Sequence, residues 1–290
     1  MSTPIPRHIL FPVDFSDRSK AILSCVISLA RQFDARITLL HVIHIPPGWY
    51  GGAEPELPVM FDTASMIDAA RRELATFFAP AEPGIAVEYA AEEGDPGARI
   101  AAYAAQHGAG LIMMGTHGFG TFRRLLLGSV TAKVLHDSHC PVWTAAHVED
   151  PELPAHCDVR SILCAISRKP ESAAVIAFAS ELARFFQAQV RLVHAVAEEP
   201  GLADYTVSDY HEDLLQRSRE ETAELQRRAG TDLEVCTAIG PVARVVREAA
   251  VAHNADLVVI GRGRIHEKLG GLRSNAYAII RESPCPVMSG

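Results

Sequence analysis

The chain has 290 residues, of which 48% are apolar, and a formal net charge of −8. This length suggests about two domains, and the apolar content excludes a disordered chain. The residues up to His147 and those after it both carry more acidic than basic side chains, which argues against a nucleic-acid-binding protein. The chain has no leader-like segment near Met1 and no run of about 18 apolar residues, so we expect a cytoplasmic protein that does not bind a membrane.

Strand and helix patterns alternate along the first half of the chain. We expect strands at 8–13, 37–43, 86–91, 111–114 and 142–145, and helices from residue 16 and at 63–78, 98–107 and 129–136. The first helix has one apolar stripe, made of Ile22, Cys25, Val26, Leu29 and Phe33. Either Ser16 or Asp17 is a candidate for its N-cap. Short apolar strands that alternate with helices predict a parallel sheet covered on both faces.

The second half of the chain repeats the first. Leu29 matches Leu182 at an offset of 153, and Cys140 matches Cys285 at an offset of 145. A repeat of about half the chain is far too long for a solenoid unit and predicts a domain duplication. We therefore expect domains at 1–147 and 161–290, joined by a polar linker with two prolines at 148–160.

A glycine motif follows the fourth predicted strand. Gly115 and Gly118 are three positions apart, and Gly128-Ser129 follows after nine further residues. In a doubly wound sheet of order 3-2-1-4-5, ligands bind beyond the carboxyl ends of strands one and four, and here those strands end near Asp14 and Gly115. The amides at a helix start favour a phosphate. A glycine-rich turn without a ligand fits the same spacing, and Asp14 also fits a helix cap.

Several other polar residues have two interpretations. Arg123 and Arg124 either neutralise a phosphate or form a solvated face, and His117 either approaches a phosphate or is a surface imidazole. His41 and His194 occupy matching strand positions, which indicates hydrogen-bonded structural histidines. The sequence contains no HExxH motif and no Cys/His cluster, so it predicts no metal site made of protein side chains. The six cysteines form no CxxC pair and are interpreted as reduced thiols.

Together these features resemble the universal stress protein family in its tandem two-domain form. The family's nucleotide signature is Gly, two residues, Gly, nine residues, Gly, and then Ser or Thr, which is complete in the first half. Family landmarks are matched by "ILFPVDFSD" from Ile9, "LLHV" from Leu39, "GDP" from Gly94 and "CPV" from Cys140. The resemblance covers almost the whole chain and implies two tandem Rossmann-like α/β domains, each with a five-stranded parallel sheet of order 3-2-1-4-5.

The resemblance also implies a nucleotide site in the first domain. By analogy with ATP-binding members, Asp14 faces the adenine, the backbone of Val42 contacts the base, and Gly128-Ser129 holds the phosphates, which carry Mg²⁺ or Mn²⁺. The implied nucleotide-binding residues are Pro12, Val13, Asp14, Val42, Met114, Gly115, Gly118, Gly128, Ser129 and Val130.

The second half departs from this signature. Ser167 stands where Asp14 stands, and Arg273-Ser274 falls where Gly128-Ser129 stands. We therefore expect an unoccupied or altered second site, and one nucleotide per chain.

The resulting hypothesis is an ATP-binding protein of stress response or signalling. No general base is convincingly placed at the phosphates, so no catalytic residue is assigned and at most slow ATP hydrolysis is expected. A slow ATPase and an interaction module without nucleotide remain alternatives. The strands at 142–145 and 287–289 are expected to pair within one chain, and the association of two chains into a homodimer is left open.

Overall fold

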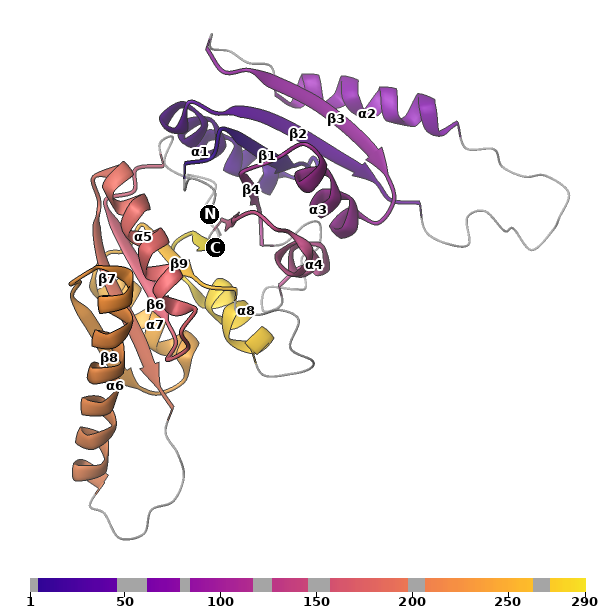
Figure 1. The fold of residues 1–290 in the computed structure, drawn as a ribbon. Helices are drawn as coiled ribbons and strands as arrows, with labels where there is room; N and C mark the ends of the chain where they lie inside the picture. Colours follow the sequence, from indigo (N-terminus) through magenta and orange to yellow (C-terminus); the bar gives the residue numbers. More distant parts are fainter. Residues whose placement is uncertain are drawn as a thin grey trace, which may run out of the picture.

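The computed structural model describes residues 5–45, 62–78, 84–116, 127–145, 157–197, 207–262 and 272–290. Two α/β halves follow each other along the chain (Figure 1). The strands of the first half are β1 (His8–Pro12), β2 (Arg36–Ile43), β3 (Val87–Glu93), β4 (Leu111–Met114) and β5 (Val142–Thr144). Its helices are α1 (Asp17–Phe33), α2 (Thr63–Phe77), α3 (Pro96–Gln106) and α4 (Ser129–Asp137).

The second half has the same order of elements. Its strands are β6 (Ser161–Ile166), β7 (Gln189–Val196), β8 (Val235–Ile239), β9 (Leu257–Ile260) and β10 (Val287–Ser289). Its helices are α5 (Ser172–Phe186), α6 (Val207–Ala229), α7 (Val242–Ala252) and α8 (Leu272–Glu282).

The ten strands of the described residues form one sheet in the order β3-β2-β1-β4-β5-β10-β9-β6-β7-β8. Each half therefore has the order 3-2-1-4-5, which confirms the predicted fold class. Neighbouring strands within a half are parallel. At the junction β5 and β10 are antiparallel, with Trp143 opposite Met288. The Thr144 hydroxyl donates to the Val287 carbonyl at 3.1 Å across this junction.

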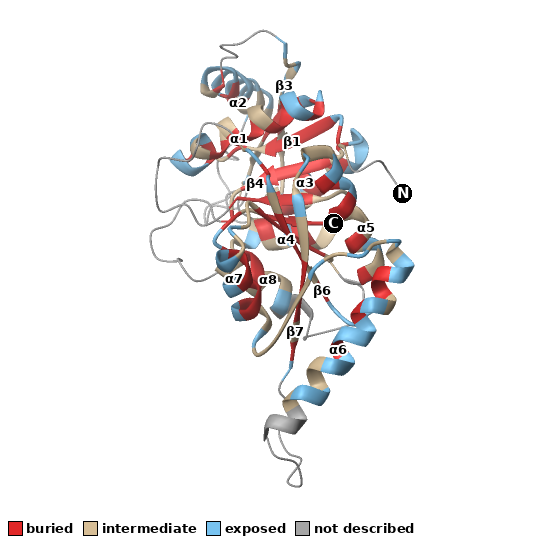
Figure 2. Ribbon diagram, turned by 90° about the vertical axis from the view of Figure 1, so that its left-hand side faces the viewer, coloured by how far each residue is buried: buried red, intermediate tan, exposed pale blue. Residues whose placement is uncertain are grey.

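Two buried apolar clusters, one on each face of the sheet, contain residues of both halves. Because successive strand residues point to opposite faces, Val142 belongs to one cluster and Trp143 to the other. Trp143 and Met288 are each 1% exposed, so the junction is part of the core. Figure 2 shows the buried strands inside the molecule and exposed outer faces on helices such as α2 and α6.

Capping residues set the start of two helices. Ser16 is the N-cap of α1, and its hydroxyl accepts a hydrogen bond from the Ser19 amide at 3.2 Å. The α3 helix begins two residues earlier than predicted because Asp95 caps it and Pro96 fits its first turn. Gly94 and Gly240, which match across the repeat, have φ of +138° and +148°, a backbone conformation that a side chain would strain.

The prediction that all six cysteines are reduced thiols is wrong. Cys25 in α1 forms a disulfide with Cys157, which lies just before β6. The two cysteines are 132 residues apart in the sequence, so no local sequence pattern predicts that they form a disulfide. Among the residues described, the free cysteines are Cys140, Cys164, Cys236 and Cys285.

The described end of the predicted linker packs against both halves. Val159 is 5% exposed and belongs to the core. The amides of Arg160 and Ser161 both donate to one carboxylate oxygen of Asp256, at 2.8 and 2.9 Å. Across the described ranges, no helix has the length and apolar character that a membrane span requires.

Candidate functional site

The candidate site lies at the carboxyl edge of the first half of the sheet. Strand β1 lies between β2 and β4, so the residues that follow Pro12 are flanked by Val42 near the end of β2 and by Gly115 after β4. Asp14, Val42 and Gly115 are all partly exposed, while Val13 and Met114 are buried beneath them. The sheet thus brings together the strand-end residues that the sequence predicts.

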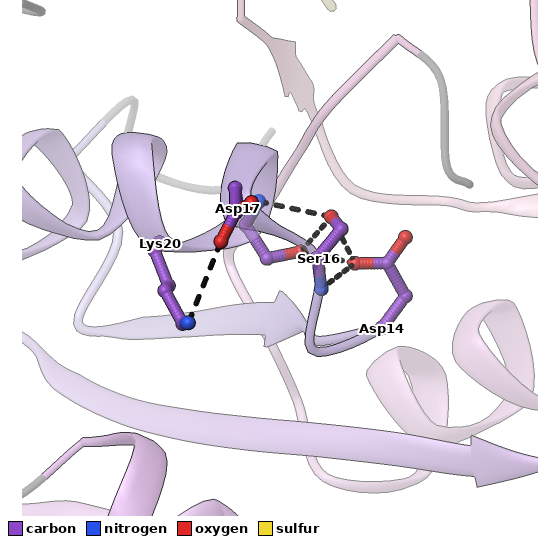
Figure 3. Close-up of polar contacts among 5 residues, drawn as sticks. Asp14, Ser16, Asp17 and Lys20 are labelled. Atoms are coloured by element: carbon purple, nitrogen blue, oxygen red, sulfur yellow. Dashed lines mark hydrogen bonds and ion pairs between the residues drawn. The ribbon is translucent and has the colours of Figure 1, made fainter. Parts of the chain in front are cut away.

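Three hydrogen bonds hold the carboxylate of Asp14. Its Oδ1 accepts from the Ser16 amide at 3.0 Å, from the Ser16 hydroxyl at 2.6 Å and from the Ser19 hydroxyl at 2.6 Å. In Figure 3 the other carboxylate oxygen points away from these donors. Ser16 and not Asp14 caps α1, so the alternative that Asp14 is the cap is wrong. One carboxylate oxygen is fixed by the serines, and the other accepts no hydrogen bond from a described residue.

The backbone next to Asp14 adopts an unusual conformation. Phe15 has φ of 61°, which is rare for a bulky residue. Its ring lies 4.6 Å from the His41 ring and 5.7 Å from the Phe77 ring, measured between centroids. The other described non-glycine residues with positive φ, Asp34, Gln187 and Asn254, all follow helix ends. Such outliers concentrate at functional sites, and Phe15 is the one next to the candidate site.

The two matching histidines are structural, as predicted. His41 Nδ1 lies 2.8 Å from the Val13 carbonyl, and His194 Nδ1 lies 3.0 Å from the Ile166 carbonyl. A carbonyl only accepts, so each ring donates from Nδ1. His41 therefore fixes the end of β1 immediately before Asp14.

The two ends of the glycine loop meet at the end of β4. The Gly128 amide donates to the Thr116 carbonyl at 2.9 Å, and the Thr131 hydroxyl donates to the Gly115 carbonyl at 3.0 Å. The positions between, including Gly118, lie outside the described residues, as do the predicted candidates His117, Arg123 and Arg124.

The start of α4 has no side-chain cap. Gly128 occupies the N-cap position and offers no side-chain oxygen, whereas Ser16, Asp62 and Asp95 cap α1, α2 and α3. Ser129 is exposed at the first position of the helix. Within the described residues, the first turn of α4 thus has no side-chain cap at the edge where an anion is expected.

The second half keeps the hydroxyl but not the carboxylate. Ser167, which replaces Asp14, is bonded to Ser172, the counterpart of Ser19. The Ser172 hydroxyl accepts from the Ser167 amide at 3.0 Å and lies 3.1 Å from the Ser167 hydroxyl. Helix α8 begins at Leu272, so Arg273-Ser274 lies in its first turn, two positions further along the helix than Gly128-Ser129 in α4. The two halves therefore differ at both ends of the candidate site.

An arginine of the second half's degenerate loop reaches into the first half. Arg262 follows Gly261, and its guanidinium donates to the Ser138 hydroxyl at 3.1 Å and to the Cys140 carbonyl. It also donates to the Ser289 carbonyl at 3.3 Å. Burial lowers the pKa of Arg262. This position has become a contact between the halves.

An ion pair ties α3 to α4 beside the site. Asp95 lies 3.2 Å from the Lys133 ammonium. A hydrogen bond from the Ala98 amide and a second from Lys133 lower the pKa of Asp95. A Cβ at Gly97 would lie 2.7 Å from the Cβ of Lys133, so this glycine allows the two helices to approach.

The sequence did not reveal the roles of Ser19, Phe15 and Lys133. For Ser19 a signal existed, because "DFSDRS" places hydroxyls two and five residues after the carboxylate. Within the described part of the chain, no group of three or more His, Cys, Asp or Glu side chains could hold a metal ion.

Comparison with known proteins agrees with this architecture. The model of the universal stress protein family matches residues 6–145 and again 158–289. Universal stress protein MJ0531 of Methanocaldococcus jannaschii is 31% identical over 137 residues, which are 47% of this chain and 79% of that protein. The chain belongs to the universal stress protein family, in a tandem two-domain arrangement.

Solved structures support the fold over the full length. A universal stress protein from Archaeoglobus fulgidus has a TM-score of 0.62 at 22% identity and covers 97% of this chain and 95% of its own. A functionally unknown protein, PA1789, from Pseudomonas aeruginosa has a TM-score of 0.66 at 17% identity. The match covers 99% of this chain and 93% of that chain. At these identities the likeness concerns the fold alone.

Proposed function

We propose that the protein binds ATP in its first half and acts in stress response or signalling. The observation that carries this proposal is the arrangement of Asp14 just after β1: serine donors fix one carboxylate oxygen, and the other points away from them. Family membership adds support, because the nucleotide signature is complete in this half and incomplete in the other.

The fixed carboxylate suits the base or ribose end of the ligand. Its other oxygen accepts hydrogen bonds and cannot donate one when ionised, so it fits the adenine amino group or a ribose hydroxyl. The hydrogen bonds from Ser16 and Ser19 hold its orientation before the ligand arrives, which reduces the entropy lost on binding. Val42, at the adjacent strand end, borders the same space.

The start of α4 suits the phosphates. The first-turn amides and the hydroxyl of Ser129 are donors, and the positive end of the helix dipole favours negative charge. The Gly128 amide already donates to Thr116, so the amides of Ser129 and Val130 are the donors we assign to the phosphates. Mg²⁺ or Mn²⁺ would be held by phosphate oxygens. The hydroxyl of Ser129 is the protein oxygen that would lie beside it.

We assign no ligand to the second half. Ser167 lacks the carboxylate, and its hydroxyl is bonded to Ser172. The helix start that would receive phosphates is displaced relative to Arg273-Ser274. One nucleotide per chain follows.

The nucleotide content of the purified protein tests the proposal. Protein purified without added nucleotide is denatured, and the released nucleotide is identified by mass spectrometry and quantified against chain concentration. We expect adenine nucleotide at no more than one per chain, and its loss in Asp14→Ala. The matched change Ser167→Ala should leave the content unchanged. If the protein neither retains nor rebinds adenine nucleotide, the proposal is wrong and an interaction module without nucleotide takes its place.

We also propose that the β5–β10 junction is a lasting pairing of the two halves in solution. The strands contribute Trp143 and Met288 to the core, and Arg262 crosses the same boundary. The chain then forms within itself a dimer-like unit of two related domains.

A further inference from the structure

The Cys25–Cys157 disulfide joins the middle of α1 to the segment that leads into β6. The two Cα atoms are 5.0 Å apart, within the usual range for disulfides. The bond is separate from the β5–β10 pairing, so it ties the connection between the halves to the first half at a second place.

Non-covalent contacts hold the same segment on α1. The Cys157 amide donates to the Ser28 hydroxyl at 3.3 Å, and the Gln32 side-chain amide donates to the Cys157 carbonyl at 3.2 Å. Two residues later, Val159 is buried in the core. These contacts keep the two sulfurs close after the bond is broken, which gives them a high effective concentration and favours its re-formation.

Three of the four other described thiols are poorly suited to redox exchange. Burial raises the pKa of the Cys164 thiol to about 12 and that of Cys285 to about 11, and it also raises the pKa of Cys140. Because the thiolate is the reactive form, these three thiols react slowly at neutral pH. Cys157 is only half-buried and Cys25 is 8% exposed, so an external thiol reaches the pair through Cys157.

We propose that the Cys25–Cys157 pair is a reversible redox clamp. In the oxidised state it fixes residues 157–160 on α1, and in the reduced state that segment is held by its hydrogen bonds and by Val159 alone. Helix α1 begins beside Asp14, so the clamp attaches the connection between the halves to the helix that positions this carboxylate. The clamp does not depend on nucleotide binding.

Thiol–disulfide exchange accounts for both directions. In reduction, a thiolate of a small dithiol attacks the sulfur of Cys157, and Cys25 leaves as a thiolate that takes up a proton. The second thiolate of the dithiol then attacks the mixed disulfide and releases Cys157. The dithiol loses two electrons and becomes a cyclic disulfide, while both cysteines become thiols. A small-molecule disulfide such as oxidised glutathione accepts the two electrons in the reverse direction.

Titration of the full chain in glutathione buffers tests the proposal. Protein equilibrated at graded ratios of reduced to oxidised glutathione is quenched with acid, alkylated in denaturant so that buried thiols react, and analysed by mass spectrometry. Circular dichroism before the quench monitors the fold. We expect six alkylated cysteines from protein that was folded and reduced. The oxidised state should give four alkylated cysteines and a linked peptide containing Cys25 and Cys157. Hydrogen exchange of peptides covering 157–161 should be about tenfold faster after reduction, because a local constraint is lost.

Single variants provide the control. Cys25→Ser and Cys157→Ser should each show the faster hydrogen exchange in both the reducing and the oxidising buffer. If one variant does not fold, the other still provides the measurement. Cys236→Ser should retain the wild-type transition. Three results would overturn the clamp: six free thiols in oxidising buffer, a disulfide that is reduced only when the protein unfolds, or equal exchange at 157–161 in the two redox states.

Discussion

At the scale of single residues, the two halves differ most clearly at Asp14 and Ser167. Each is followed five residues later by a serine that contacts it, Ser19 or Ser172. In the first half the serine hydroxyl donates to a carboxylate whose other oxygen accepts no hydrogen bond from a described residue. In the second half two hydroxyls bond to each other where the carboxylate would stand. The duplication has thus kept a serine five residues further on but changed both the chemistry and the helix start, because α1 begins at Asp17 with the cap Ser16, whereas α5 begins at Ser172 without a side-chain cap.

The contact between Ser19 and Asp14 gives a prediction about affinity. Ser19→Ala removes one of three donors to Oδ1. A hydrogen bond to a charged group contributes about 1.5–3 kcal/mol, and this is the largest loss of binding free energy to expect. Part of that loss is recovered because Ser16 still holds the carboxylate. We expect the Kd for Mg-ATP to rise about three- to tenfold, measured by isothermal titration calorimetry.

Ser172→Ala is the matched control for this prediction. It removes the corresponding hydroxyl of the second half and should leave the Kd unchanged. An unchanged Kd in Ser19→Ala, with a thermal midpoint close to that of the wild type, would show that Ser19 does not position Asp14 for the ligand.

At the scale of secondary structure, hydrophobic periodicity and the internal repeat predicted every strand and helix of the first half to within two residues. The strand at Leu111–Met114 and the start of α4 at Ser129 agree to the residue. The largest shifts are two residues, at the end of β3 and at the start of α3, where the cap Asp95 and the first-turn Pro96 extend the helix backwards. Periodicity marks the apolar face of an element, whereas its end is set by capping bonds.

Two contacts between distant residues were beyond sequence reasoning. The disulfide joins residues 132 positions apart, and Arg262 contacts Ser138 from the other half. No periodic pattern reports either contact, because each depends on how the two halves meet. The strand-end positions of the candidate site were predictable, since the strand order alone places them at one edge.

The uncapped start of α4 gives a prediction at this scale. If phosphates bind there, the amides of Ser129 and Val130 become hydrogen-bonded, and their hydrogen exchange should slow at least about fivefold with Mg-ATP. Peptides covering 127–137 report this by mass spectrometry. Peptides covering 242–252 in α7, whose N-cap Pro241 also provides no side-chain bond, serve as the internal control and should not change. Slowing of equal size in both helices would indicate general stabilisation of the protein and not a contact at α4.

At the scale of the whole molecule, the two halves form one continuous sheet. Besides the strand pairing, the Tyr277 hydroxyl in α8 donates to the Ala132 carbonyl in α4 at 3.1 Å, and Arg262 reaches the turn before β5. The ring of Phe33 in α1 lies 5.2 Å from that of Phe185 in α5. Contacts thus cross the boundary from both faces of the sheet.

This arrangement predicts the behaviour of the first half alone. Residues 1–148 would expose the edge of β5 and the side chain of Trp143, which the second half covers in the full chain. An uncovered apolar edge strand pairs readily with another chain. We expect the fragment to self-associate, most simply as a dimer, when examined by analytical ultracentrifugation. A folded fragment that stays monomeric at about 100 μM would count against β5 as the pairing edge, since association of this kind falls in the micromolar range or tighter.

The central claim is that one ATP binds each chain, in the first half, and titration of the full chain with Mg-ATP tests it most directly. We expect a stoichiometry of one, and the loss of binding in Gly128→Val. Gly128 has φ of −59° and ψ of 143°, which valine adopts without strain, so the added side chain acts by blocking the helix start. Two equivalent sites per chain, or unchanged binding in a folded Gly128→Val protein, would contradict the account.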